Sequence, residues 1–68
     1  MKYIEFRIFV PDQKTKFRII DKLRGYGNIN HKFNVIYGDG PKYWLMHRFA
    51  EIRKKEGKNV KIEWRDLI

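Results

Sequence analysis

The sequence predicts an α+β fold, in which a small single-layer sheet of three or four strands has two helices packed on one face. Strict alternation of apolar and polar residues opens the chain, which is typical of a strand with one buried side. Two later segments place apolar residues three and four apart, which is typical of amphipathic helices. The predicted order is β-α-β-α-β, ferredoxin-like or related. Right-handed crossovers then place both helices on one side and leave the other sheet face open.

The first strand and helix follow from the segment before Gly25. Along KYIEFRIFV, one face of the strand takes Ile4, Phe6, Ile8 and Val10, and the other takes Tyr3, Glu5, Arg7 and Phe9. Pro11 ends the strand, and Asp12 is predicted to cap a helix that begins near Gln13. Ile19, Ile20 and Leu23, flanked by Phe17, form its apolar stripe. Gly25 closes this helix.

The middle of the chain predicts another strand and the second helix. In the extended segment, Phe33, Val35 and Tyr37 alternate with Lys32, Asn34 and Ile36. A short strand through residues 28–30 is a further option, which would make four strands in all. The GDGP segment is interpreted as a turn in which Asp39 caps the following helix. Leu45, Phe49 and Ile52 define the inward side of that helix, which runs to Gly57.

The last strand is predicted in NVKIEWRDL, with Val60, Ile62 and Trp64 facing inward. A chain of 68 residues is expected to form one domain, residues 1–68, with a thin core. The chain has no cysteine to add a disulfide and only two histidines, which are too few for a structural zinc site. A larger partner or a homodimer would supply the stability that such a core lacks.

The strongest compositional signal is positive charge. Sixteen Lys and Arg against eight Asp and Glu give a net charge of +8 and a pI near 10, which favours polyanionic partners such as nucleic acid. The absence of cysteine argues against a small disulfide-bonded secreted protein. Glu5 and Arg7 interrupt the apolar run of residues 4–10, which argues against a signal peptide or a membrane span. We therefore expect a cytoplasmic protein that does not associate with membranes.

The open sheet face is the first candidate site. Exposed aromatic rings interleaved with cations can stack unpaired bases and contact their phosphates. Single-stranded RNA or DNA is therefore favoured slightly over a duplex. The alternative is a solvated sheet on which Glu5 and Glu63 form cross-strand ion pairs with the cations. The predicted nucleic-acid-binding residues are Tyr3, Arg7, Phe9, Lys32, Lys61 and Arg65.

A protein interface is the second candidate site. Around the second predicted helix, large aromatic and basic side chains fall on the far side or flank, away from Leu45 and Phe49. Trp, Tyr and Arg are over-represented among interface hot spots. The chain would then be a non-catalytic adaptor or inhibitor of a larger protein. The residues in question are Tyr43, Trp44, His47 and Arg48, and the alternative for Trp44 is that it fills a gap in the core.

The remaining patterns are weaker. The first helix carries a basic stripe, Lys14, Arg18 and Lys22 with Lys16 and Arg24 beside it, which is either a duplex-contacting surface or an ordinary solvated face. No serine or cysteine is present, which excludes nucleophilic catalysis by either residue type. His31 with His47, or Glu5 with Glu63 holding a metal, are the residual catalytic options, but no defined spacing unites them. We expect no enzyme activity, no cofactor and no metal.

Overall fold

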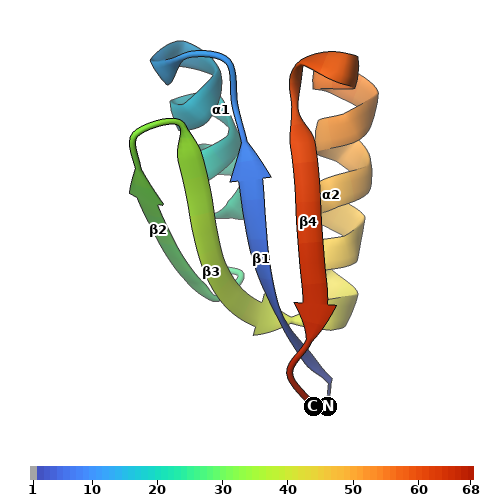
Figure 1. The fold of residues 1–68 in the computed structure, drawn as a ribbon. Coiled ribbons are helices and arrows are strands. Elements are labelled where there is room, and N and C mark those ends of the chain that lie inside the picture. Colours follow the sequence, from blue (N-terminus) through green and yellow to red (C-terminus); the bar gives the residue numbers. More distant parts are fainter. Residues whose placement is uncertain (1) are drawn as a thin grey trace.

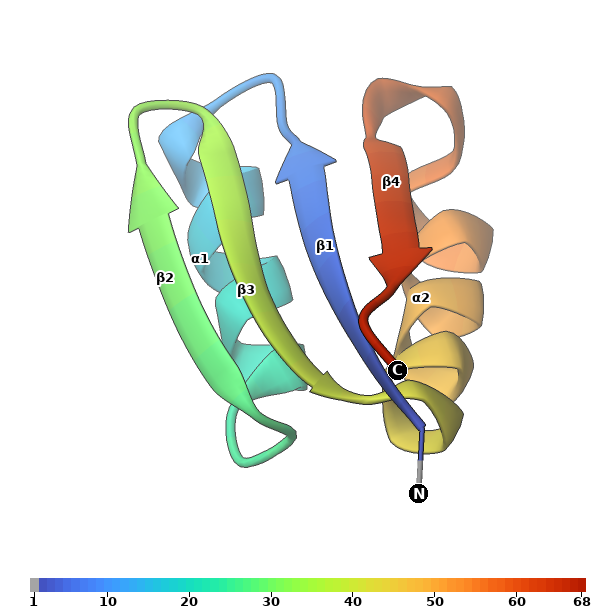
Figure 2. The ribbon, with the colours of Figure 1, turned by 60° about the horizontal axis from the view of Figure 1, so that its bottom comes forward.

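The computed structural model describes residues 2–68 and shows an α+β fold (Figure 1). An open four-stranded antiparallel sheet has both helices behind the same face (Figures 1 and 2). The elements are β1 (Tyr3–Phe9), α1 (Gln13–Leu23), β2 (Asn28–Lys32), β3 (Val35–Pro41), α2 (Lys42–Glu56), a short 3-10 helix η1 (Gly57–Asn59) and β4 (Lys61–Asp66).

The predicted β-α-β-α-β order is not matched. The middle segment folds as two strands rather than one, so the chain follows the order β-α-β-β-α-β, with α2 after β3. Across the sheet the strands lie in the order β2-β3-β1-β4, which leaves β2 and β4 at the edges (Figure 1). Every neighbouring pair is antiparallel. The fourth strand, which the sequence predicted only as an option, is present as β2, and it contains His31.

The core lies between the sheet and the two helices. The alternation predicted for β1 is confirmed, because its even-numbered residues are buried and its odd-numbered residues face the uncovered side. Phe49 of α2 meets Phe6 of β1 edge to face, with ring centres 5.3 Å apart, an arrangement that aromatic pairs prefer. The buried apolar residues are Ile4, Phe6, Ile8, Val10, Ile19, Leu23, Ile36, Leu45, Phe49, Ile52 and Val60.

Helix α1 begins at the cap predicted from the sequence. Asp12 has an extended backbone and its Oδ1 accepts a hydrogen bond of 2.7 Å from the backbone N–H of Thr15. That bond satisfies one of the N–H groups that a helix leaves unpaired at its first turn. The backbone N–H of Thr15, followed by its hydroxyl group, lowers the pKa of the Asp12 carboxyl below its ordinary value. The carboxylate form of Asp12 therefore favours the folded state.

This cap makes part of the stability pH-dependent. Because the folded pKa of Asp12 lies below the unfolded value of 3.8, its contribution is present above that pH and lost as pH falls through the folded pKa. Asp12→Asn keeps a capping oxygen but does not titrate. We expect the difference in urea midpoint between the native protein and Asp12→Asn to shrink as pH falls below about 4. A difference that is constant with pH would contradict this assignment.

A two-residue turn at Phe33 and Asn34 separates β2 from β3, and it corrects the predicted strand. In one continuous strand, Lys32 and Val35 would face opposite sides, but across this turn they are paired and share a side. The alternation therefore shifts, so that Ile36 is fully buried and Tyr37 faces the open side. Phe33 adopts a left-handed φ of 54° at the turn, which is unusual for a residue of this type.

The hairpin tip is attached to α1 by Lys16. The basic stripe predicted on α1 placed Lys16 on the surface, but its side chain is only 4% exposed. Its Nζ donates a hydrogen bond of 2.9 Å to the carbonyl oxygen of Phe33 and lies 5.2 Å from the centre of the Phe17 ring. Gln13 donates to Asn34 at 2.9 Å. The buried ammonium group thus has a partner, as burial of a charged group requires.

The GDGP segment is strand rather than turn, and Asp39 does not cap α2. Gly38 to Pro41 belong to β3, and Pro41 is the cap residue of α2. Asp39 instead accepts a hydrogen bond of 3.1 Å from the side chain of Asn28. The glycines here allow close backbone approach: a Cβ at Gly38 would overlap the carbonyl oxygen of Asn28, and one at Gly40 would overlap that of Tyr26.

Neither helix in residues 2–68 combines the length and the apolar character needed to cross a bilayer.

Candidate nucleic-acid interface

The uncovered sheet face is ordered in rows, because residues paired across strands lie on the same side. The register defines three rows running from β2 to β4. We call them the rim row, at the end of the sheet where β1 ends, the middle row and the lower row. The rim row is Lys32, Val35, Phe9 and Lys61; the middle row is Asn30, Tyr37, Arg7 and Glu63; the lower row is Asn28, Asp39, Glu5 and Arg65.

All six residues predicted for nucleic-acid binding lie on this face, or at its end in the case of Tyr3. Phe9, Lys32 and Lys61 share the rim row, whereas Arg7 and Arg65 belong to the middle and lower rows. Tyr3 lies beyond the lower row, opposite Pro41. The fold therefore brings five of the predicted side chains together over three strands and places Tyr3 at the far end.

The arginines and Lys61 have acidic neighbours on the same face. Arg7 Nη2 lies 3.4 Å from Glu63 Oε1, and Lys61 Nζ lies 3.4 Å from Glu63 Oε2. Arg65 contacts Glu5. These are the cross-strand ion pairs considered as the alternative interpretation of this surface. Because all of these side chains are partly or largely exposed, such pairs stabilise the fold little and exchange readily with other anions.

The rim row is the most cationic part of the face. Lys32 and Lys61 stand at its two ends, on the outer strands, with Val35 and Phe9 between them. Within residues 2–68 Lys32 forms no ion pair, and its Nζ lies 5.7 Å from the centre of the Phe33 ring. Phe33 follows at the hairpin tip and is 80% exposed. The rim thus combines two separated positive charges with apolar surface.

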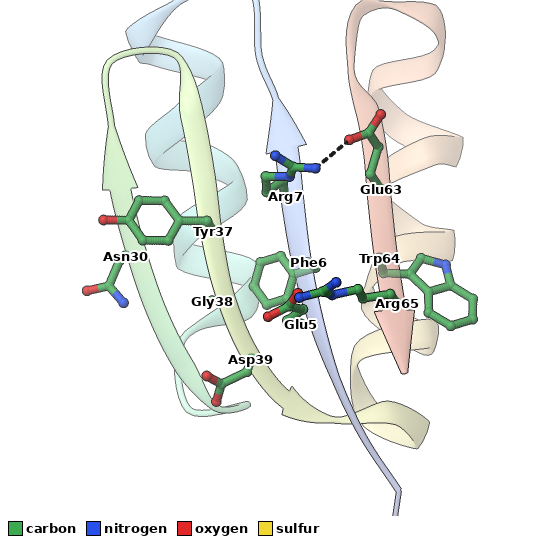
Figure 3. A pocket seen from close by; sticks show the side chains of 10 residues that line it. All are labelled: Glu5, Phe6, Arg7, Asn30, Tyr37, Gly38, Asp39, Glu63, Trp64 and Arg65. Atoms are coloured by element: carbon green, nitrogen blue, oxygen red, sulfur yellow. Dashed lines mark hydrogen bonds and ion pairs between the residues drawn. The ribbon is translucent and has the colours of Figure 1, made fainter. Parts of the chain in front are cut away.

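A hollow of about 740 Å³ lies over the middle and lower rows (Figure 3). Figure 3 shows Tyr37 and Asn30 on one side of it and the Arg7–Glu63 pair on the other. Tyr37 is 41% exposed. The lining combines an aromatic ring with amide, carboxylate and guanidinium groups, which together donate and accept hydrogen bonds. A planar ring bearing both donors and acceptors is the kind of group such a lining accommodates.

Tyr37 and Asn30 were missed from the sequence. A single strand through residues 32–37 placed Tyr37 on the buried side, and Asn30 lay in a strand that remained optional. The observed two-residue turn moves Tyr37 to the open face, and β2 is present and pairs Asn30 with Tyr37. The Asn-Gly or Asp-Gly pair that usually marks such a turn is absent here, so the local sequence gives little sign of it.

The residues predicted for a protein interface form a connected aromatic cluster at the start of α2. The Tyr43 ring centre lies 5.3 Å from that of Trp44 and 4.8 Å from that of His47. The Trp44 ring centre also lies 6.3 Å from that of Tyr26. At 51% exposure Trp44 does not fill a gap in the core, so that alternative is wrong.

Arg48 is held in place beside this cluster. Its guanidinium donates to the hydroxyl oxygen of Tyr26 and, at 2.9 Å, to Glu51. These hydrogen bonds raise the pKa of Arg48 above its ordinary value, and the bond to Tyr26 has a larger effect than the bond to Glu51. The Arg48 guanidinium and the Trp44 ring therefore both lie against Tyr26.

The basic stripe of α1 is largely occupied by internal contacts. Arg18 bonds Glu56 of α2 at 3.0 Å, which is the main cause of the raised pKa of Arg18. Arg24 pairs with Asp21 at 3.1 Å, and Lys16 is buried. Of the stripe residues, this leaves Lys14 and Lys22, and neither forms an ion pair with any residue in 2–68. This distribution favours the solvated-face interpretation of the stripe over a duplex-contacting one.

The catalytic options gain no geometric support. Glu5 and Glu63 each contact an arginine, and residues 2–68 contain no cluster of three or more metal-ligating side chains. The ring centre of His31 lies 5.6 Å from that of Phe17, whereas His47 packs against Tyr43. The two histidines therefore contact different residues.

Comparisons with known proteins give no match to a family model, to a curated protein or to a solved structure.

Proposed function

We propose that the protein is a small module that binds single-stranded nucleic acid on the open sheet face. The observation that carries this proposal is Tyr37, which lies exposed in a hollow lined by hydrogen-bonding side chains, next to a rim with a lysine at each end. Bases stack on such rings with little dependence on sequence, while cations contact the phosphates. The net charge of +8 favours approach of a polyanion.

In the proposed complex, the rows of the open face have different tasks. Tyr37 stacks one base in the hollow, and Asn30 with the Arg7–Glu63 pair offers hydrogen bonds to its edge. Phe9 and Phe33 provide apolar contact at the rim. Lys32 and Lys61 contact phosphates on either side. Single strands are preferred to duplex, because the bases of a duplex are stacked on one another and do not present their faces.

Replacing Tyr37 tests the stacking contact. Loss of one base-stacking ring costs about 1–3 kcal/mol, so Tyr37→Ala should weaken binding of a labelled single-stranded oligonucleotide by roughly 5- to 150-fold. Tyr37→Phe keeps the ring and should bind nearly as well as the native protein. Fluorescence anisotropy measures both affinities. Equal affinities for Tyr37→Ala and Tyr37→Phe would contradict the assignment.

Measuring the same affinity at several salt concentrations tests the contribution of the rim-row lysines. With Lys32→Gln and Lys61→Gln combined, the slope of log K against log salt for a single strand should fall by about 1.4, or roughly 0.7 for each phosphate that is no longer neutralised by a lysine. Lys22→Gln on α1 is the matched control and should leave the slope unchanged. No detectable binding of either single-stranded or duplex oligonucleotides would overturn the proposed function itself.

A non-catalytic adaptor or inhibitor that docks on a larger protein remains a second candidate. The specific observation in its favour is the exposed Tyr43–Trp44–His47 cluster beside the fixed Arg48. Trp44→Ala would then abolish capture of the partner, while the Lys32 and Lys61 substitutions would not affect it. Nuclease treatment separates the two candidates, because a captured protein that survives nuclease supports this one.

A further inference from the structure

Among residues 2–68, strand β4 is an edge of the sheet with β1 as its one neighbouring strand. The backbone N–H of Leu67 donates to the carbonyl oxygen of Tyr3 at 2.8 Å. Because hydrogen-bonding directions alternate along a strand, the N–H and C=O groups of Ile62, Trp64 and Asp66 point away from β1. Figure 2 shows β4 at the margin of the sheet. An edge of this kind can pair with another strand.

The side chains of β4 are complementary to a second copy of the same strand. If two antiparallel β4 strands meet about a two-fold axis at Trp64, Glu63 of each copy lies opposite Arg65 of the other. The two Trp64 residues then face each other. The neighbouring register, centred on Glu63, sets Glu63 against itself and Lys61 against Arg65. Like charges directly opposite are destabilising and unlike charges stabilising, so the charge pattern disfavours the register centred on Glu63. A register centred on Ile62 would set Glu63 against Lys61, so the participation of Arg65 distinguishes the register centred on Trp64 from it.

An apolar groove beside this edge provides further surface for burial. It encloses about 630 Å³ and is lined by Lys2, Lys42, Tyr43, Met46, His47 and Ala50. Lys42 connects the groove to β4, because its Nζ bonds Asp66 at 3.0 Å and lies 4.8 Å from the centre of the Trp64 ring. Trp64 is 38% exposed. A copy paired along β4 would cover this ring and bring the two α2 grooves toward each other.

The other edge of the sheet lacks this complementarity. Strand β2 has no acidic residue, so a two-fold axis there forms no ion pair between copies. Its side toward the helices is already contacted by α1, through the packing of Phe17 on His31 at 5.6 Å. Of the two edges, β4 is the one whose charged residues can form ion pairs across a two-fold axis.

We propose that the protein forms a homodimer through antiparallel pairing of β4, centred on Trp64. The four-stranded sheet would then continue across the two-fold axis, with both open faces on the same side. Dimerisation does not depend on the proposed nucleic-acid binding. If both hold, a longer single strand can cross the two faces in succession.

Charge reversal tests the register. Glu63→Arg alone gives two facing Arg–Arg contacts, and Arg65→Glu alone gives two facing Glu–Glu contacts. Each variant should therefore dimerise about tenfold or more weakly than the native protein. When the two are mixed, both contacts become Arg–Glu, so the mixture should recover a dimer. Light scattering after size exclusion gives the masses, and circular dichroism checks that each variant is folded.

The native protein provides a measurement that needs no substitution. In a dimer, hydrogen exchange at the backbone N–H groups of Ile62, Trp64 and Asp66 should slow as protein concentration rises. The exchange of Lys61 and Glu63, which already bond to β1, serves as the internal reference. A native protein that stays monomeric at the highest concentration reached, or a mixture of variants that does not dimerise, would overturn the proposal.

Discussion

Phe49→Ala is expected to cause a large loss of stability. Phe49 is fully buried and packs edge to face on Phe6 at the centre of the core. Truncation of a buried phenylalanine costs about 3–5 kcal/mol. At about 0.05–0.15 kcal/mol per residue, a chain of 68 residues has a total stability of only roughly 3–10 kcal/mol. The single substitution therefore removes a large share of the stability, or all of it.

Urea denaturation followed by circular dichroism measures this loss, and Phe33→Ala is the matched control. It removes the same atoms from a side chain that is 80% exposed, so its effect should lie within about 0.5 kcal/mol. Phe49→Leu leaves a smaller cavity and should fall between the two. Similar midpoints for Phe49→Ala and Phe33→Ala would show that this core assignment is wrong.

Gly38→Ala is expected to separate β2 from β3. A methyl group at Gly38 would overlap the carbonyl oxygen of Asn28 and lie 2.9 Å from its carbon. Overpacking commonly costs about 1–3 kcal/mol, and here the obstructing atoms are backbone, which has no alternative rotamer. The strands must move apart at the Gly38–Ile29 pair. The cost should therefore be at the upper end of that range or above it.

Gly57→Ala distinguishes this clash from a general glycine effect. Gly57 has a φ of 62° and a ψ of −135°, a backbone conformation that few residues other than glycine adopt, and open space around its missing Cβ, so alanine there costs about 1–3 kcal/mol through backbone strain alone. Hydrogen exchange at residues 28–32 should accelerate in Gly38→Ala and remain slow in Gly57→Ala. Slow exchange in both variants would refute the close approach of β2 and β3.

The sequence predicts those elements whose periodicity is undisturbed by turns. The alternation of β1 and the helical spacing of Leu45, Phe49 and Ile52 both identify buried faces that the structure confirms. The cap at Asp12 is also confirmed, because a side chain that caps a helix acts within one turn of its own position.

The remainder depends on contacts between distant residues. The shift in alternation after β2 comes from a turn with Phe33 in a left-handed conformation, which no local preference predicts. Burial of Lys16 depends on the carbonyl oxygen of Phe33, which is distant in sequence. The glycines of GDGP suggested a turn, because the local sequence does not reveal that the backbone of β2 packs closely against them. Tyr37, the central residue of the candidate site, was missed for the first of these reasons.

The attachment of the hairpin tip to α1 has a consequence for affinity. Lys16 and Gln13 tie the tip to the first helix, so Lys32 and Phe33 extend from a braced loop rather than a freely moving one. A ligand that meets a preorganised surface loses less conformational entropy on association than one that must order a loop. If the rim contacts phosphates as proposed, weakening this brace would reduce affinity through entropy alone, although neither Lys16 nor Gln13 touches the ligand.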